Sequence, residues 1–293
     1  MAGSSFPQAS DANLRIVMMM TLPLQEETSY GEATQAFERG FVATSSGSVA
    51  VDKRPFHTFA EKLRVPRFEG AIERPRLDDL LEKSCRQFGA TVLSGRAGTG
   101  KTTVAAGFAS RYREIAWYSV ESADSDWNVF SHYINAALMK TRAFGLDADV
   151  SIFETENISR SEEVSRFVSE LFSRQVTGSR NSPLLIVLDD IQHLFDADWF
   201  NDFFTLMLHS LAPEVHLLML CRSKPPMPLW RLRSKQRLNV IDEKLLAFSA
   251  EEAERLYREH GLTGDAAKNA HRASFGRASK LAAVLNSTRL SHA

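Results

Sequence analysis

The chain has 293 residues, of which 44% are hydrophobic and 24% charged, a composition typical of a globular protein with a sizeable core. Its 35 Lys and Arg residues against 36 Asp and Glu residues give a formal net charge of −1, which excludes a bulk electrostatic attraction to nucleic acid or to an anionic membrane. The two cysteines, Cys85 and Cys221, have no metal-ligand spacing, so a reducing, cytoplasmic location is expected.

The N-terminal residues 1–58 are predicted to be poorly ordered, because they are rich in Ser, Gly, Ala and Thr and show no sustained hydrophobic period. Within them, the apolar stretch Ile16–Leu24 is too short to span a bilayer and contains Pro23. No small-residue cleavage site follows it, since Gln25 and two glutamates come next. A cytoplasmic protein without membrane contact is therefore favoured over a secreted one.

From residue 59 onward, predicted strands alternate with predicted helices. The strands are short, mostly apolar runs over Ala90–Ser94, Glu114–Val120, Leu184–Leu188, Val215–Cys221 and Leu238–Ile241. Capping residues and apolar stripes predict helices over Lys101–Tyr112, after Asp126, after Ser159 and over Phe200–Leu211. This alternation predicts an α/β fold, a doubly wound parallel sheet of about five strands covered on both faces.

A small helical lid subdomain is predicted for residues 247–293, after a main domain that covers residues 59–246. Ser249 and Glu252 have the spacing of a capping box, and Gly261 is a natural helix stop. Two further short helices are expected, over residues 265–274 and 277–285.

The segment from Gly95 to Thr102 reads Gly-Arg-Ala-Gly-Thr-Gly-Lys-Thr, the complete Walker A pattern of a P-loop. In such a loop, backbone N–H groups and the N-terminus of the following helix bind nucleotide phosphates. Lys101 is expected to contact the β- and γ-phosphates, and the Thr102 hydroxyl to ligate Mg²⁺. A Gly-rich turn without a ligand is the disfavoured alternative. The predicted residues for binding ATP or ADP are Gly95, Arg96, Ala97, Gly98, Thr99, Gly100, Lys101, Thr102 and Thr103.

An apolar strand that ends in two acids, Leu184–Asp190, has the form of a Walker B motif. Asp189 is expected to hold Mg²⁺, which prefers hard oxygen ligands. Asp190 lies where a base that polarises water is needed, and its carboxylate reaches less far than that of a glutamate. Slow hydrolysis is therefore expected. The alternative is a strand that meets an ordinary polar turn.

Arg222 directly follows the fourth predicted strand and is expected at the carboxyl edge of the sheet, where it can sense or stabilise the γ-phosphate. Its alternative is a solvated charge at a strand end. A second basic cluster is interpreted as a solvated face rather than a nucleic-acid patch, because the chain has no net positive charge. Its members are Trp230, Arg231, Arg233, Lys235 and Arg237.

Several segments resemble, in the same order, the maltose-activator type of large ATP-binding LuxR regulators, within the STAND class of P-loop ATPases. They are Lys62–Arg67, Ile72–Leu77, Ala116–Val120 with Asp124 and Phe130–Leu138, Leu188–Asp190 with His193, Arg222–Pro225 with Leu229–Arg233, and Phe248–Leu256. The resemblance covers about residues 60 to 285. It implies a switch between a resting, closed ADP form and an open, self-associating ATP form, and it makes Arg74 a candidate for contact with the nucleotide.

Members of that family continue into a winged helix, a sensor domain of repeats and often a DNA-binding helix-turn-helix, whereas this sequence ends at Ala293. Specific DNA binding by this chain alone is therefore not expected, and its output should need another protein or self-association in the ATP state. The predicted function is an ATP-binding signalling switch with slow, Mg²⁺-dependent hydrolysis. The alternatives are a non-hydrolysing nucleotide-binding module or truncated regulator, a nucleic-acid-acting P-loop ATPase and, less favoured, a small-molecule kinase.

Overall fold

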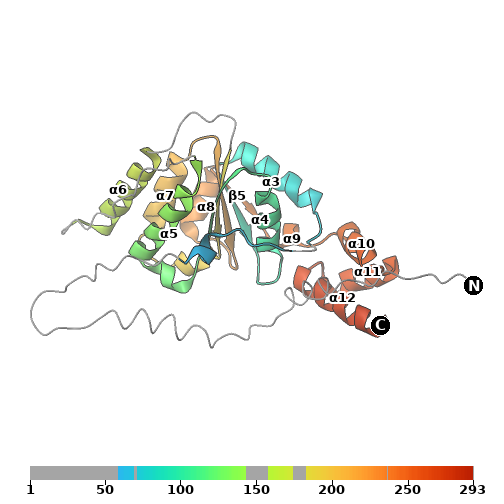
Figure 1. Cartoon of the computed structure of the whole chain (residues 1–293). Helices are drawn as coiled ribbons and strands as arrows, with labels where there is room; N and C mark the ends of the chain where they lie inside the picture. Colours follow the sequence, from blue (N-terminus) through green and yellow to red (C-terminus); the bar gives the residue numbers. More distant parts are fainter. Residues whose placement is uncertain (1–58, 69–70, 143–157, 174–182, 236, 293) are drawn as a thin grey trace, which may run out of the picture. The chain divides into compact units, whose positions relative to one another are not determined.

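Five apolar segments form a single parallel sheet in the computed structural model, which describes residues 59–68, 71–142, 158–173, 183–235 and 237–292 (Figure 1). All the elements named below belong to one unit, residues 60–293. The prediction for residues 1–58 falls outside the described residues. Among the described helices, none has the length and apolar content that crossing a bilayer requires.

The strand order of the sheet is β2-β3-β4-β1-β5. Adjacent strands run parallel, with Val92 opposite Met219 in the β1–β4 pair and Ile186 opposite Leu217 in the β3–β4 pair. The strands are β1 Ala90–Ser94, β2 Glu114–Ser119, β3 Leu184–Asp189, β4 Val215–Cys221 and β5 Leu238–Ile241. The predicted doubly wound α/β fold with five parallel strands is confirmed.

Both faces of the sheet are covered by helices, which is why its strands are continuous apolar runs rather than alternating ones. Along β3, Ile186 packs in the hydrophobic cluster shared with α5, α6 and α7, while Leu185 and Val187 pack in the opposite cluster with α3 and α4. Figure 1 shows these two groups of helices on opposite sides of the strands. The flanking helices are α3 Pro75–Gln87, α4 Lys101–Ala109, α5 Trp127–Met139, α6 Arg160–Ser173, α7 Phe200–Ser210, α8 Met227–Ser234 and α9 Glu243–Leu246, with short 3₁₀ turns at Ala60–Leu63, Ser122–Ser125 and Ile191–Leu194.

Local capping explains where several helices begin. The Asp126 side chain accepts hydrogen bonds from the Asn128 and Val129 amides at the start of α5, as predicted. Helix α4 ends at Ala109, one turn earlier than predicted, because the Arg111 amide bonds three residues back to Phe108 and tightens the chain into a turn that leads to β2. Helix α3 was not predicted as a helix.

Three helices form the C-terminal part of the unit: α10 Ala250–Glu259, α11 Gly264–Ser274 and α12 Ala278–His292. The capping box of Ser249 and Glu252 is present at the start of α10. These helices share their own apolar core, made by Ala253, Tyr257, Ala267, Ala270, Leu281 and Leu285. We call α10–α12 the lid below; the boundary between residues 246 and 247 stays a prediction.

Candidate functional site

The predicted phosphate loop joins the end of β1 to the start of α4. Gly98 and Gly100 have φ values of 77° and 86°, in the left-handed region that favours glycine. The Lys101 ammonium donates hydrogen bonds to the backbone oxygens of Gly95, at 2.6 Å, and Arg96, at 3.2 Å. The Lys101 side chain therefore folds back onto the loop, and its ammonium is held by the backbone carbonyls at the start of the loop.

Lys101 is buried beside two carboxylates. Burial lowers the pKa of its ammonium, and the charges of Asp190 and Asp189 act in the opposite direction. Asp189 ends β3 and Asp190 follows it directly, so in the parallel sheet both lie at the same edge as the loop that follows β1, with β4 between the two strands. The sheet thereby brings the predicted phosphate-binding cation to the predicted metal-side acids.

Asp189 has the features of a metal-side carboxylate. Burial, and next the charge of Asp190, raise its pKa to about 6, while hydrogen bonding with Thr102 lowers it. Its Oδ1 is buried and has no hydrogen-bond partner in the part of the chain that the structure describes. No group of three or more acidic, His or Cys ligands occurs among those residues. Thr102 with Asp189 instead fits an ion that takes few protein oxygens and completes its shell with phosphates and water, as Mg²⁺ does.

Asp190 and Arg222 form an ion pair at the carboxyl ends of β3 and β4. Arg222 Nη2 lies 2.8 Å from Asp190 Oδ2, and Nε lies 3.2 Å from Oδ1. Burial would raise the pKa of Asp190, but hydrogen bonds from Arg222 and Gln192 and the charge of Arg222 outweigh it and lower that pKa. Asp190 has φ 58°, a left-handed conformation that Asp tolerates better than most residues. Asp190 and Arg222, two of the three side chains predicted as catalytic together with Lys101, therefore neutralise each other.

Arg96, predicted as part of the nucleotide site, is turned towards α9. Its backbone amide donates to Glu243 Oε2 at 3.2 Å, and its guanidinium forms an ion pair with the same carboxylate at 2.8 Å. Its side chain is exposed, so solvent screens this pair and it adds little to stability.

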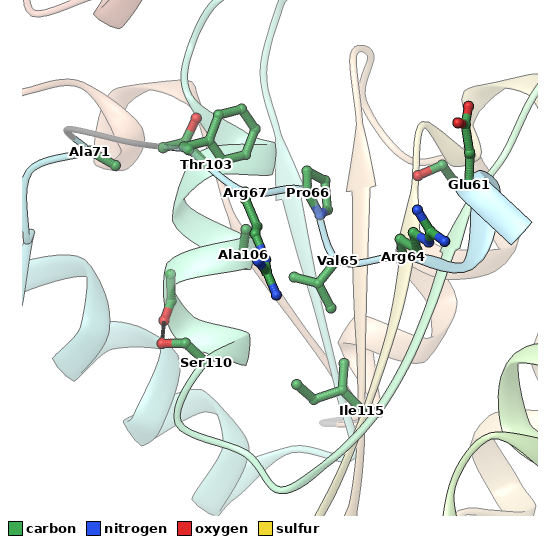
Figure 2. Close-up of a pocket in the computed structure, with 13 residues that line it drawn as sticks. Glu61, Arg64, Val65, Pro66, Arg67, Ala71, Thr103, Ala106, Ser110 and Ile115 are labelled. Atoms are coloured by element: carbon green, nitrogen blue, oxygen red, sulfur yellow. Dashed lines mark hydrogen bonds between the residues drawn. The ribbon is translucent and has the colours of Figure 1, made fainter. Parts of the chain in front are cut away.

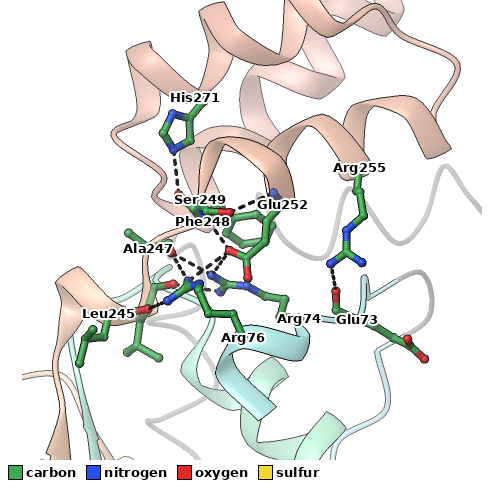
Figure 3. Close-up of polar contacts among 11 residues, drawn as sticks. Glu73, Arg74, Arg76, Leu245, Ala247, Phe248, Ser249, Glu252, Arg255 and His271 are labelled. Carbon is green, nitrogen blue, oxygen red and sulfur yellow. Dashed lines mark hydrogen bonds and ion pairs between the residues drawn. The ribbon is translucent and has the colours of Figure 1, made fainter. Parts of the chain in front are cut away.

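Arg74 lies where the start of α3 meets the lid (Figure 3). Its guanidinium donates to the Leu246 and Ala247 carbonyls and to Glu252 Oε2, each at 2.9 Å, and stacks 4.0 Å from the Phe248 ring centre. Arg76 donates to the same carboxylate at 3.2 Å. The structure thus ties Arg74 to residues 246–248, which precede the lid, and to Glu252 of α10, and its contact with a nucleotide stays a prediction.

A cavity of about 1120 Å³ opens beside α4 (Figure 2). Thr103, which lines this cavity, directly follows the predicted phosphate ligand Lys101 and the predicted Mg²⁺ ligand Thr102 in the sequence. Thr103 and Ala106 line it from α4, and Val65, Pro66 and Arg67 line it from the segment before α3. Thr103, predicted as a nucleotide contact, thus lies at the border between the phosphate loop and a cavity whose walls are apolar and carry both basic residues and Glu61.

The lid also contacts the phosphate loop, which the sequence did not predict. The Arg277 guanidinium donates to the Ala97 carbonyl, and the Ser279 amide donates to the Gly98 carbonyl at 2.9 Å. No local pattern in the segment 275–281 marks these residues, because their partners lie far away in the sequence. The basic cluster that was interpreted as solvated lies on α8 and beyond it, with exposed Arg231, Arg233, Lys235 and Arg237 side chains and Arg233 over the Trp230 ring.

The chain is similar to a known ATPase domain and to known transcriptional regulators. The family described as the AAA ATPase domain matches residues 71–220. The HTH-type transcriptional regulator MalT of Vibrio parahaemolyticus is 28% identical over 201 residues, covering 69% of this chain and 22% of that protein, and MalT of Vibrio campbellii is 28% identical over 209 residues, covering 70% and 22%. The chain thus spans about a fifth of the length of these curated relatives. A Signal Transduction ATPase with Numerous Domains (STAND) protein with a tetratricopeptide repeat sensor from Pyrococcus horikoshii aligns with a TM-score of 0.48 at 18% identity, over 74% of this chain and 30% of that chain.

Proposed function

Since the chain belongs to the AAA ATPase domain family, we propose that it is a cytoplasmic, ATP-binding signalling switch of the STAND class that hydrolyses Mg·ATP slowly. One observation carries this proposal: the buried ammonium of Lys101 lies close enough to three charged side chains at one edge of the sheet for their charges to shift its pKa. They are Asp189, Asp190 and Arg222. Open α/β sheets bind ligands at this carboxyl edge.

Each residue has a distinct task in the proposed site. The amides of the phosphate loop and the N-terminus of α4 bind the phosphates, and Lys101 exchanges its bonds to the loop carbonyls for bonds to phosphate oxygens. Thr102 and Asp189 would hold Mg²⁺, which neutralises charge on the phosphates when it is bound. The cavity beside Thr103 has room for the nucleoside.

Slow turnover is supported by the ion pair between Asp190 and Arg222. A carboxylate that accepts two hydrogen bonds from a guanidinium, and whose pKa is lowered, is a weak base for water. Arg222 would have to turn towards the γ-phosphate before Asp190 could polarise a water molecule. The same observation keeps a non-hydrolysing nucleotide-binding module as the second candidate function.

We propose that the output of the switch passes through another protein or through self-association in the ATP state. The relatives named above are HTH-type transcriptional regulators, and the chain corresponds to about a fifth of their length. A formal net charge of −1 supplies little sequence-independent attraction to DNA phosphates. Specific DNA binding by this chain alone, and a nucleic-acid-acting ATPase, are therefore not favoured.

The test combines mass identification of any nucleotide that copurifies with the protein, calorimetric titration with ATP and ADP in Mg²⁺, and steady-state phosphate release. We expect retained ADP, binding of both nucleotides and slow release of phosphate. Lys101→Ala removes charged hydrogen bonds worth about 1.5–3 kcal/mol each and should weaken ATP binding at least about tenfold. Lys83→Ala, an exposed lysine on α3, is the control. Equal affinities for the wild type and Lys101→Ala would refute nucleotide binding at this loop, and binding without phosphate release would favour the second candidate.

A further inference from the structure

The lid donates hydrogen bonds to two backbone carbonyls in the middle of the phosphate loop. The carbonyls of Gly95 and Arg96 accept hydrogen bonds from the loop's own side chains, Lys101 and Thr99. The next two carbonyls, of Ala97 and Gly98, accept hydrogen bonds from Arg277 and from the Ser279 amide. The first half of the loop therefore supports itself, whereas the second half depends on the lid.

The direction of a carbonyl fixes the direction of the amide that follows it, because the trans peptide is planar and its C=O and N–H point in opposite directions. A lid that binds the Ala97 and Gly98 carbonyls on one side therefore directs the amides of Gly98 and Thr99 to the other side. Backbone amides of a P-loop are the groups that bind phosphate. Glycine at position 98 lacks the Cβ that would restrict rotation of these planes, so the outer hydrogen bonds are needed to define them.

The close fit of the lid is a second observation. A Cβ on Gly98 would lie 2.7 Å from Ser279 Cβ, and one on Gly100 would lie 3.5 Å from Ala278 Cβ. The glycines of this loop thus leave space for the first turn of α12 on their outer side. Arg277 caps that turn, since its carbonyl accepts the Leu281 amide.

We propose that Arg277 and Ser279 are positioning residues for nucleotide binding: they hold the Ala97–Thr99 peptide planes in the phosphate-binding orientation and so couple the lid to the nucleotide. This inference rests on the proposed nucleotide function but adds to it, because neither residue needs to touch the nucleotide. Loss of the contact between lid and loop lowers the affinity for ATP and for ADP alike, because the oriented amides bind phosphates that both nucleotides have. Bound nucleotide, in turn, stabilises the lid against the loop.

The first experiment measures ATP and ADP affinities of Arg277→Ala, Arg277→Lys and Arg272→Ala by calorimetry. Arg277→Ala should lose about tenfold in affinity for both nucleotides. Arg277→Lys restores a cationic donor for the Ala97 carbonyl and should recover most of the loss, and Arg272, exposed on α11, serves as the matched control. An unchanged affinity in Arg277→Ala overturns the proposal, and so does a loss confined to ATP, which would indicate direct contact with the γ-phosphate.

The second experiment needs no nucleotide and so separates this inference from the proposed function. Amide hydrogen exchange of residues 95–104 and 277–283 is compared between the wild type, Arg277→Ala and Ser279→Leu, whose larger side chain forces α12 away from Gly98. Both variants should exchange faster in both segments, while Lys280→Leu, an exposed neighbour, should match the wild type. Exchange unchanged in both variants overturns the lid contact even if the protein binds nucleotide. A wild type that binds no nucleotide, with faster exchange in the variants, overturns only the proposed function and leaves the contact between lid and loop supported.

Discussion

Arg222 forms a two-pronged ion pair with Asp190, although 32 residues separate them: Nη2 lies 2.8 Å from Oδ2 and Nε 3.2 Å from Oδ1. The pair joins the residue that follows β3 to the residue that follows β4, two neighbouring strands of the sheet. A site that binds the γ-phosphate must therefore compete with Asp190 for the guanidinium.

Arg222→Ala should weaken ATP binding several-fold more than ADP binding, because only ATP offers the γ-phosphate that would take Arg222 from Asp190. Titration calorimetry with both nucleotides measures the ratio. Arg231→Ala, an exposed arginine on α8, should change neither affinity. Equal losses for ATP and ADP in Arg222→Ala would mean that Arg222 supports the loop or contacts the other phosphates.

Asp190→Asn should leave Mg·ATP binding close to that of the wild type and reduce phosphate release, because the substitution keeps the shape of the side chain and removes the basic carboxylate. A coupled phosphate-release assay under saturating ATP measures this, with binding checked by calorimetry on the same samples. Turnover at the wild-type rate in Asp190→Asn would leave Asp190 without a role in activating water.

The Mg²⁺ dependence of ATP binding should weaken as the pH falls below about 6, because Asp189 has a pKa raised to about 6 by burial and by Asp190. Above that pH the carboxylate is ionised and can ligate the metal; below it, a proton competes with Mg²⁺. Calorimetric titrations at pH 7.5 and pH 5.5, with and without Mg²⁺, measure the effect. Asp189→Asn should show a weak Mg²⁺ dependence at both pH values, and it controls for titration of the nucleotide itself. An equal pH effect in the wild type and in Asp189→Asn would contradict the assignment.

Glu252→Ala should destabilise the protein by about 3 kcal/mol, because it leaves the Arg74 guanidinium buried without its carboxylate. Arg74 is 6% exposed and Glu252 4%, so solvent screens the pair weakly. Chemical denaturation followed by circular dichroism measures the loss. Glu251→Ala, at the exposed neighbouring position, should stay within about 0.5 kcal/mol of the wild type. A Glu252→Ala protein as stable as Glu251→Ala would show that the ion pair adds nothing to the attachment of the lid.

Stability should fall when the pH drops from 7 to 5, because burial lowers the pKa of His216 to about 4. An imidazole with an ordinary pKa near 6.5 in the unfolded chain takes up its proton there first, so protonation favours unfolding between about pH 6.5 and pH 4. The neutral ring is satisfied by the Thr91 hydroxyl at 2.9 Å and the Phe88 carbonyl at 3.1 Å. The expected loss from this group is roughly 2 kcal/mol between pH 7 and pH 5.

Denaturant unfolding at both pH values measures that loss. His216→Gln, which has no titratable group, should show a shallower decrease between pH 7 and pH 5 than the wild type. The same slope in both proteins would assign the pH dependence to other groups.

The sequence by itself determined the sheet and the phosphate loop. Runs of apolar residues, such as Leu184–Leu188, indicate buried parallel strands. Glycines at fixed spacing before a lysine indicate the phosphate loop. These signals are local: they depend on neighbours a few residues away. Helix caps at Asp126 and Ser249 were predicted for the same reason. Helix α3 was missed because its buried face is narrow, with Leu77, Leu81 and Ser84 among many charged residues.

Only the tertiary structure decided how these parts contact one another. The strand order places Arg222 against Asp190, and the return of the chain over the sheet edge places Glu252 against Arg74, 178 residues away, and Arg277 against Ala97, 180 residues away. An arginine in a sequence carries the same charge whether it faces solvent, a carboxylate or a carbonyl. Its partner is selected by the packing of distant elements, and no spacing within the chain records that choice.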